Sequence, residues 1–405
     1  MNATAASSPR RIALLLAALQ AIVGSCPPIA ISMGGLAGLY LLGADKSLAT
    51  APVTGFNVGV ALGALPAAAI ARALGRRNGF WVGTLFSALG GGVAAVSLFH
   101  QNFWLFVIGL LVIGAGNSFV QQYRFAAADN APASFKARAI SWVMAGGMFA
   151  AIIGPQTVIY TRELLAPVPF AGSFVALIGL AAIGAVILFF LDLPKDTPAA
   201  SFAEHEAARP LATILAQPRL IIAFLCAVSS YGLMSFVMTG APLAMVGCGL
   251  GTDDAVHGIQ WHVMAMFGPS FFTGRLITRF GKEKIVATGL VLLVGCALTA
   301  LSGIDLWRFW TALVLLGVGW NFGFIGATAI LTESYRPSEK NKVQGLHDFL
   351  LFGTVAFASL MSGQVYNAYG WDMLNWIVFP VVAICLGSLG VLAIGRSRTR
   401  LAAGE

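Results

Sequence analysis

Long apolar segments recur along the whole of this 405-residue chain, and polar breaks or breaks rich in glycine and proline divide them into twelve. The first runs from Ile12 to Leu42, the fourth from Phe103 to Phe125 and the eleventh from Val343 to Tyr366. A helix needs about 20 apolar residues to cross a bilayer core that is about 30 Å thick. We therefore expect an all-α integral membrane protein with twelve transmembrane helices.

The composition excludes an ordinary soluble fold. Hydrophobic residues make up 58% of the chain and charged residues only 10%, against about 25% charged in a typical soluble domain. Arg10 and Arg11 precede the first apolar segment, as in a secretory signal. That segment is far longer than a signal-peptide core of about 7–15 residues, so we interpret it as the first helix.

Positive charge is distributed very unevenly between the two sides of this layout. With twelve spans both termini share one side, and 21 of the 24 Lys and Arg residues fall there, leaving only Lys46, Arg162 and Arg308 for the other. Because cytoplasmic loops are enriched in Lys and Arg, the pattern predicts a bacterial inner-membrane protein with both termini cytoplasmic. The net charge of +8 is then an orientation signal, and we expect no nucleic-acid partner.

The longest polar segment divides the chain into two groups of six spans. We expect an N-terminal six-helix half at residues 1–192, a cytoplasmic linker at residues 193–218 and a C-terminal six-helix half at residues 219–405. The halves repeat one another, because Gly116 precedes Gly319 by 203 residues and Asp129 precedes Glu333 by 204. Such a constant offset indicates an internal duplication and hence two pseudo-symmetric halves.

A short motif follows the eighth span and reads Gly274, Thr278, Arg279, Gly281 and Lys282 at its informative positions. It resembles the hallmark of the major facilitator superfamily, Gly-x-x-x-Asp-Arg-x-Gly-Arg-Lys, except that threonine replaces the aspartate. The resemblance implies the major facilitator fold and a secondary transporter that works by alternating access. It also implies a site for a small-molecule substrate between the halves.

The first copy of the motif, after the second span, keeps three of its residues, which are Gly75, Arg76 and Arg77. The resemblance brings the cations of both copies near the acidic ends of the fourth and tenth spans. We expect ion pairs across the cytoplasmic seam that close an inner gate, formed by Arg76, Arg77, Asp129, Arg279, Lys282 and Glu333. The alternative is that these cations are solvated and only set the topology.

The fourth span carries the clearest substrate-binding candidates. Asn117, Gln121 and Arg124 are spaced i, i+4 and i+7, which places them on one face of a continuous helix. We expect this stripe to line the cavity, whereas Gln122 lies off that face. The alternatives are amides that join neighbouring helices and an arginine that extends to the cytoplasmic surface.

Aromatic and amide side chains on other spans extend this candidate site, namely Trp142, Tyr231, Trp320 and Asn321. Few charges occur at mid-depth, so the set suits a largely neutral solute with a flat ring and hydrogen-bonding groups. His347 and Asp348 open the eleventh span and are candidates for proton coupling, because histidine titrates near neutral pH. The alternative is a structural pair that closes the cytoplasmic side.

Two runs narrow the resemblance further, one from Tyr123 to Asp129 and one from Trp320 to Ser334. They look like a proteobacterial branch of the superfamily that includes riboflavin importers, so the resemblance implies riboflavin uptake. The alternatives are efflux of neutral aromatic drugs or metabolites and a membrane scaffold that transports nothing.

The sequence contains no recognisable catalytic or cofactor motif. Neither H-E-x-x-H, G-x-S-x-G nor a P-loop is present, and the five cysteines form no C-x-x-C pair. We therefore expect no enzymatic activity, no catalytic or metal site and no cofactor. The expected partners are the substrate and the lipid bilayer, with the protein acting as a monomer.

Overall fold

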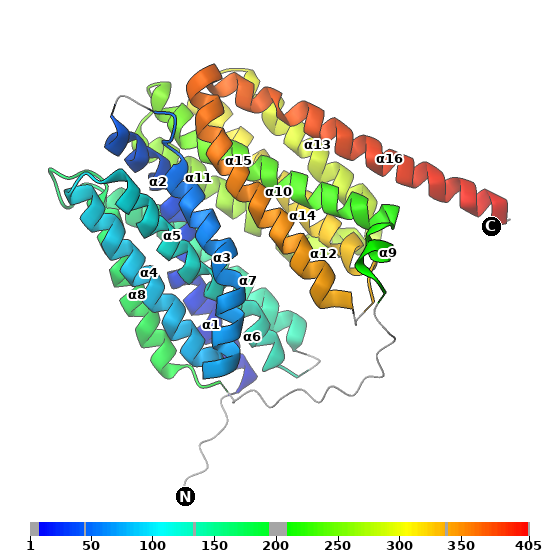
Figure 1. The fold of residues 1–405 in the computed structure, drawn as a ribbon, viewed down its shortest axis with the longest axis horizontal. Helices are drawn as coiled ribbons and strands as arrows, with labels where there is room; N and C mark the ends of the chain where they lie inside the picture. Colours follow the sequence, from blue (N-terminus) through cyan, green and yellow to red (C-terminus); the bar gives the residue numbers. More distant parts are fainter. Residues whose placement is uncertain (1–7, 44–45, 133–134, 194–208, 337–338, 404–405) are drawn as a thin grey trace, which may run out of the picture.

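The computed structural model describes residues 8–43, 46–132, 135–193, 209–336 and 339–403, which form a bundle of long helices (Figure 1). The N-terminal part contains α1 (Pro9–Ile22), the 3-10 helix η1 (Val23–Ser25), α2 (Cys26–Leu42), α3 (Ala51–Leu74), α4 (Arg76–Phe99), α5 (Phe103–Val120), α6 (Tyr123–Asp129), α7 (Lys136–Thr161) and α8 (Ala171–Phe190). The C-terminal part contains α9 (Leu211–Leu215), α10 (Pro218–Gly247), α11 (Thr252–Phe267), α12 (Ser270–Phe280), α13 (Lys282–Leu301), α14 (Leu306–Thr332), α15 (Lys340–Trp376) and α16 (Val378–Ala403).

The predicted twelve membrane passes are recovered. Ten stretches of the described residues are long and apolar enough to cross a membrane, and one of them, Leu346–Ile394, is 49 residues long. Gly370, with φ 79° and ψ −174°, divides that stretch into two passes. The remaining pass is α11 with α12, which are 16 and 11 residues long and which Gly268 and Pro269 separate.

Two of the predicted passes contain an interruption of the α-helix. The first changes from α-helix to 3-10 helix at Val23–Ser25, just before Pro27 and Pro28, which cannot donate backbone hydrogen bonds. The fourth ends as α5 at Val120 and resumes as α6 at Tyr123. The span predicted from Phe103 to Phe125 is therefore one membrane pass built from two helices.

Each half packs around its own apolar core. In the N-terminal half α3 and α5 approach backbone to backbone, because a Cβ added at Gly59 would meet the Leu111 carbonyl and one at Gly114 would meet that of Phe56. Large apolar side chains also cover the outside of the bundle, where Leu65 is 82% exposed and Val391 70% exposed. A lipid environment accommodates such a surface, whereas water would not.

The predicted linker at residues 193–218 falls mostly on residues 194–208, which lie outside the described part of the chain. Its described end includes the short helix α9 and leads into α10 at Pro218. Arg209 is tied there to Glu339, with Nε 2.7 Å and Nη2 2.8 Å from the two carboxylate oxygens. The start of the C-terminal half is thus anchored to the segment before α15.

Candidate functional site

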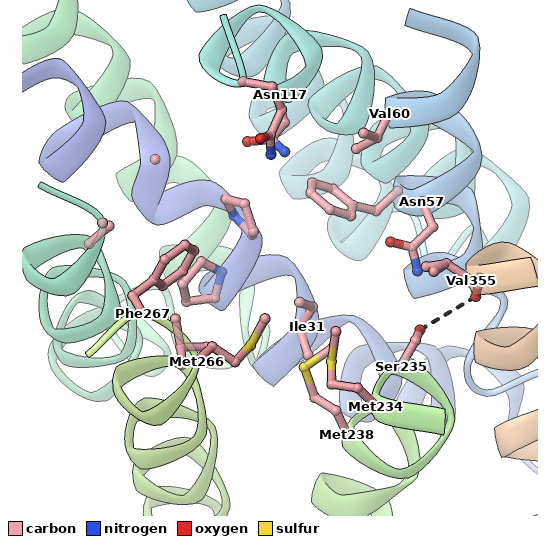
Figure 2. A pocket seen from close by; sticks show the side chains of 18 of the residues that line it. Ile31, Asn57, Val60, Asn117, Met234, Ser235, Met238, Met266, Phe267 and Val355 are labelled. Carbon is pink, nitrogen blue, oxygen red and sulfur yellow. Dashed lines mark hydrogen bonds between the residues drawn. The ribbon is translucent and has the colours of Figure 1, made fainter. Parts of the chain in front are cut away.

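A cavity of about 890 Å³, counted with its open mouth, lies between the two halves. Helices of both halves contribute to its wall (Figure 2), which consists of Gln20, Gly24, Pro27, Pro28, Ile31, Phe56, Asn57, Val60, Asn117, Gln121, Gly147, Ala150, Tyr231, Met234, Ser235, Met238, Val263, Met266, Phe267, Phe352 and Val355. The position matches the site expected for an alternating-access transporter.

The stripe predicted on the fourth span reaches this space despite the break in its helix. Asn117 and Gln121 line the main cavity. Gln121 and Arg124 line a side chamber of about 380 Å³, again counted with its open mouth, that shares Gln20, Gln121, Gly147 and Phe267 with the main cavity. The backbone at Gln121 stays near helical values, with φ −59° and ψ −20°, so the face is continued across the turn. Gln122 belongs to neither lining, as expected.

The amides in the cavity wall have no partner in the part of the chain that the structure describes. Among the described residues, the side chains of Gln20, Asn57, Asn117 and Gln121 make no hydrogen bond, although Asn117 is only 4% exposed. Polar groups at membrane depth are costly unless they are paired or face a water-filled space. These amides are therefore available to a solute.

Asn321 differs from these amides, because its side chain is fully satisfied inside the C-terminal half. It accepts a hydrogen bond from Thr273 Oγ1 at 2.6 Å and donates to Met266 O and Ser270 Oγ, each at 2.7 Å. It is completely buried and lies outside the cavity wall. The structure thus places Asn321 where it joins α14 to α11 and α12.

Trp320 and Trp142 also lie outside the cavity wall in this conformation. Trp320 stacks on Phe324 with 5.3 Å between ring centroids, and the edge of Tyr231 packs on it at 5.2 Å. Of this cluster Tyr231 lines the cavity. The Trp142 ring packs against the Phe135 ring near the start of α7, with 5.3 Å between their centroids. In this conformation it does not line the cavity, where it was predicted to bind substrate.

The sequence analysis missed Asn57 and the methionines Met234, Met238 and Met266, all of which line the cavity. Asn57 had a usable signal, because it is the one amide in the apolar segment Ala51–Leu74, and an isolated amide at membrane depth indicates a functional position. The methionines had none, since apolar side chains on a buried helix do not reveal which face they occupy.

Polar contacts join the halves at one end of the bundle. Arg162 of α7 pairs with Asp253 of α11, with 2.7 Å between Nη1 and Oδ1. Nearby, Gln156 donates to Gln260 at 3.0 Å, and further contacts link α3 to α15, as Thr54 Oγ1 lies 3.1 Å from Ser359 Oγ. These contacts hold the two halves together at this end of the bundle.

The other end, which we call the basic face, carries the motif cations Arg76, Arg77, Arg279 and Lys282. The predicted ion pairs across the seam are wrong for this conformation, because each acidic residue pairs within its own half. Arg76 binds Asp129 at 2.6 Å, and Lys282 binds Glu333, which Arg219 also contacts at 2.9 Å. Within the described residues, the ion pairs of Asp129 and Glu333 therefore stay inside one half each.

The two remaining motif arginines make local contacts. Arg77 donates to the carbonyls of Leu188 and Phe189 at the end of α8, at 3.3 and 2.9 Å. The Arg279 guanidinium lies 5.2 Å from the centroid of the Phe280 ring. Arg77 therefore fixes the end of a helix in its own half, and neither contact crosses between the halves.

His347 and Asp348 lie near the start of α15, outside the cavity wall. His347 Nδ1 is 3.1 Å from Asp348 Oδ1, and its buried Nε2 has no hydrogen-bond partner among the described residues. Its ring packs between Phe224, at 5.4 Å, and Phe324, at 6.4 Å. Phe324 in turn contacts Tyr231 at 5.2 Å, so a chain of rings connects His347 with the cavity.

The model of the Major Facilitator Superfamily matches this chain over residues 12–346 and 259–403. The chain belongs to this superfamily. It is a multi-pass membrane protein of the secondary-transporter type. Within the described ranges, His, Cys, Asp and Glu side chains form no group of three that could hold a metal ion.

Characterised and uncharacterised bacterial proteins are similar over almost the whole chain. The riboflavin transporter RfnT of Brucella anthropi is 52% identical over 383 residues, which cover 95% of this chain and 96% of RfnT. The uncharacterised MFS-type transporter YddS of Bacillus subtilis is 32% identical over 375 residues, or 87% of this chain and 85% of YddS.

Solved structures share the fold at much lower sequence identity. The xylose transporter XylE from E. coli superposes with a TM-score of 0.69 at 13% identity, over 94% of this chain and 97% of XylE. The POT family transporter PepTSo gives a TM-score of 0.68 at 12% identity, over 96% and 98% of the two chains. These likenesses support the predicted major facilitator fold.

Proposed function

We propose that this protein imports riboflavin across the bacterial inner membrane by alternating access. The observation that carries the proposal is the 52% identity, over 95% of the chain, to a protein named as a riboflavin transporter. The cavity is chemically suited to the vitamin, since unpaired amides and aromatic rings line it. Riboflavin is uncharged at neutral pH, and it combines a flat ring system with a hydroxylated chain.

The conformation is that of a carrier open toward its basic face. Polar contacts such as Arg162 with Asp253 close the opposite end, whereas the side chamber continues the cavity past Gln121 to the exposed Arg124. With the positive-inside orientation, the basic face is cytoplasmic, and the described state is the one that releases an imported solute. Entry from the periplasm requires the contacts at the closed end to break.

Coupling to protons is proposed through His347 and Asp348. Asp348 is 61% exposed and contacts the buried His347, so a proton from the cytoplasmic solution reaches the pair directly. His347 contacts Phe324, and Phe324 contacts Tyr231 in the cavity wall. These ring contacts connect the His347–Asp348 pair with the substrate site. A change of charge at the pair then alters which conformation is preferred.

The test is growth of a bacterium that can neither synthesise nor import riboflavin, at a vitamin concentration too low for passive entry. We expect growth when the gene is expressed, together with uptake of radiolabelled riboflavin that unlabelled flavin competes away. Purified protein in proteoliposomes should catalyse the same uptake, which distinguishes a carrier from a scaffold. Membrane insertion with drug resistance but no growth would refute import and favour efflux.

A further inference from the structure

We propose that the cavity binds the flavin ring in one orientation. The imide edge of the ring contacts Asn57 and Asn117 of the N-terminal half, and the methylated benzene edge lies on Met234, Met238 and Met266 of the C-terminal half. The inference rests on the proposed riboflavin transport and adds which end of the ring each half recognises. It makes Asn57 and Asn117 the residues that determine specificity.

The N-terminal wall presents a polar edge in a fixed position. Asn57 on α3 and Asn117 on α5 direct their amides into the cavity (Figure 2), and neither amide has a partner among the described residues. The two helices that carry them pack backbone to backbone at Gly59 and Gly114, one turn or less from each asparagine. Both amides are therefore held on a rigid support, which preorganises each of them for a hydrogen bond to a solute.

The C-terminal wall is apolar and deformable. Met234 and Met238 are one helical turn apart on α10, and Met266 lies near the end of α11; their exposed fractions are 1%, 6% and 8%. Figure 2 shows all three with Ile31 along the part of the cavity away from Asn117. Thioethers adapt to irregular shapes and make favourable contacts with aromatic edges, so this wall suits a methylated aromatic ring.

The two edges of the flavin ring differ in the same way as the two walls. One edge is a pyrimidinedione, which alternates carbonyl acceptors with an N–H donor, and a carboxamide has both the donor and the acceptor needed to match it. The other edge is a benzene ring with two methyl groups. The reversed orientation would place carbonyls against thioethers and leave both amides unpaired, which costs the desolvation of every unmatched polar group.

The hydroxylated chain of riboflavin leaves the ring from its middle, and the remaining free amides accommodate it. Gln20 and Gln121 line both the main cavity and the side chamber that leads to Arg124. Both side chains lack partners within the described residues. The chain therefore extends toward the basic face while the ring stays between the two walls.

The first test uses the unaltered protein and flavin analogues as competitors of riboflavin uptake. An analogue methylated at the imide nitrogen loses the donor that the amides require, and we expect it to compete about tenfold less well than riboflavin. An analogue with a dimethylamino group in place of the C8 methyl changes only the apolar edge, and we expect it to compete within about twofold.

The second test replaces Asn57 by leucine, with Gln122→Leu as the matched control in an amide that lines neither chamber. In Asn57→Leu the KM for riboflavin should rise about tenfold. The imide-methylated analogue should then compete nearly as well as riboflavin, so that the ratio of their potencies as competitors approaches one. The control should keep both values. Unchanged discrimination in a membrane-inserted Asn57→Leu protein would overturn the assignment.

The analogue series also separates this inference from the function on which it rests. If the unaltered protein takes up riboflavin but tolerates the imide-methylated analogue and rejects the C8-substituted one, the proposed orientation is wrong and the transport function stands. If the unaltered protein takes up no riboflavin, the proposed function fails and the orientation fails with it.

Discussion

Arg162 and Asp253 form an ion pair between the two halves, with 2.7 Å between Nη1 and Oδ1. Arg162 caps the end of α7, and Asp253 lies in the first turn of α11. The arginine side chain is 18% exposed and the carboxylate 46%. Because the pair is partly solvated, we expect it to contribute about 0–1 kcal/mol, which is enough to bias the balance between two conformations of similar energy.

Neutralising this pair should shift the carrier toward the state that is open at the end where the pair lies, which is the periplasmic end. For Arg162→Ala we expect up to about a fivefold rise in that population. It can be measured as labelling of Ser235→Cys, in the cavity wall, by an impermeant thiol reagent from the periplasm. The exposed native Cys248 must first be replaced by serine.

Arg308→Ala is the matched control for this gate. Arg308 pairs with Asp305 at 2.6 Å within one helix turn and joins no two halves, so its loss should leave labelling unchanged. The double exchange Arg162→Asp with Asp253→Arg should restore low labelling. Equal labelling in the Arg162 and Arg308 variants would remove the ion pair from the gate.

Neighbouring glutamines on the fourth span should differ in function. Gln121→Ala removes an amide from both chambers and should raise the KM for riboflavin about fivefold, as expected for one hydrogen bond of about 1 kcal/mol. Gln122→Ala should have little effect. Both proteins must first be shown at equal abundance in the membrane; equal transport by the two would contradict the assignment of the cavity face.

The carboxylate of Asp348 is predicted to be required for coupling. The asparagine in Asp348→Asn can neither bind nor release a proton. Stimulation of uptake by a proton gradient should therefore disappear, while exchange of internal for external riboflavin continues. Measuring both reactions in the same proteoliposomes separates coupling from binding. Gradient-driven uptake that persists in the variant would exclude Asp348 from the coupling mechanism.

Glu339 should stabilise the protein in a pH-dependent way. Hydrogen bonds from Arg209, and from the backbone N–H of Arg336, lower the pKa of this buried carboxyl to about 2 from its ordinary value of 4.5. A lowered pKa means stabilisation that is present above pH 4.5 and lost as the pH falls toward 2. The melting temperature of Glu339→Gln in detergent should therefore lie below that of the parent at pH 7.

The pH series supplies the internal check on this prediction. The difference in melting temperature between Glu339→Gln and the parent should shrink as the pH falls below about 4.5. Glu163→Gln, at a carboxylate that is 79% exposed, should leave the melting temperature nearly unchanged at every pH. A difference that does not vary with pH would mean that the glutamate acts by packing alone.

The orientation in the membrane is predicted from charge and can be measured directly. A reporter fused after Lys195 should be cytoplasmic, and one fused after Thr252 should be periplasmic, because 21 of the 24 Lys and Arg residues lie on the first side. Alkaline phosphatase activity at the Lys195 fusion would reverse the layout and with it the direction assigned to the open face.

The sequence by itself determined the number of passes, their order and the superfamily. These follow from local properties, because the length and apolar content of each segment decide whether it crosses a bilayer. The motif around Gly281 forms the turn between α12 and α13. The φ angle of Gly281 is +91°, a conformation in which a residue with a side chain would be strained. The structure adds helix interruptions at Val23 and Gln121, inside two of these passes.

The tertiary structure decided which side chains face the cavity. Asn117 and Asn321 occupy equivalent places in the two halves of the sequence, yet Asn117 has a free amide in the cavity wall and Asn321 is bound to Thr273 and Ser270. Spacing along a helix fixes which residues share a face but not what that face meets. That depends on how helices far apart in sequence pack, and on which of its conformations the carrier adopts.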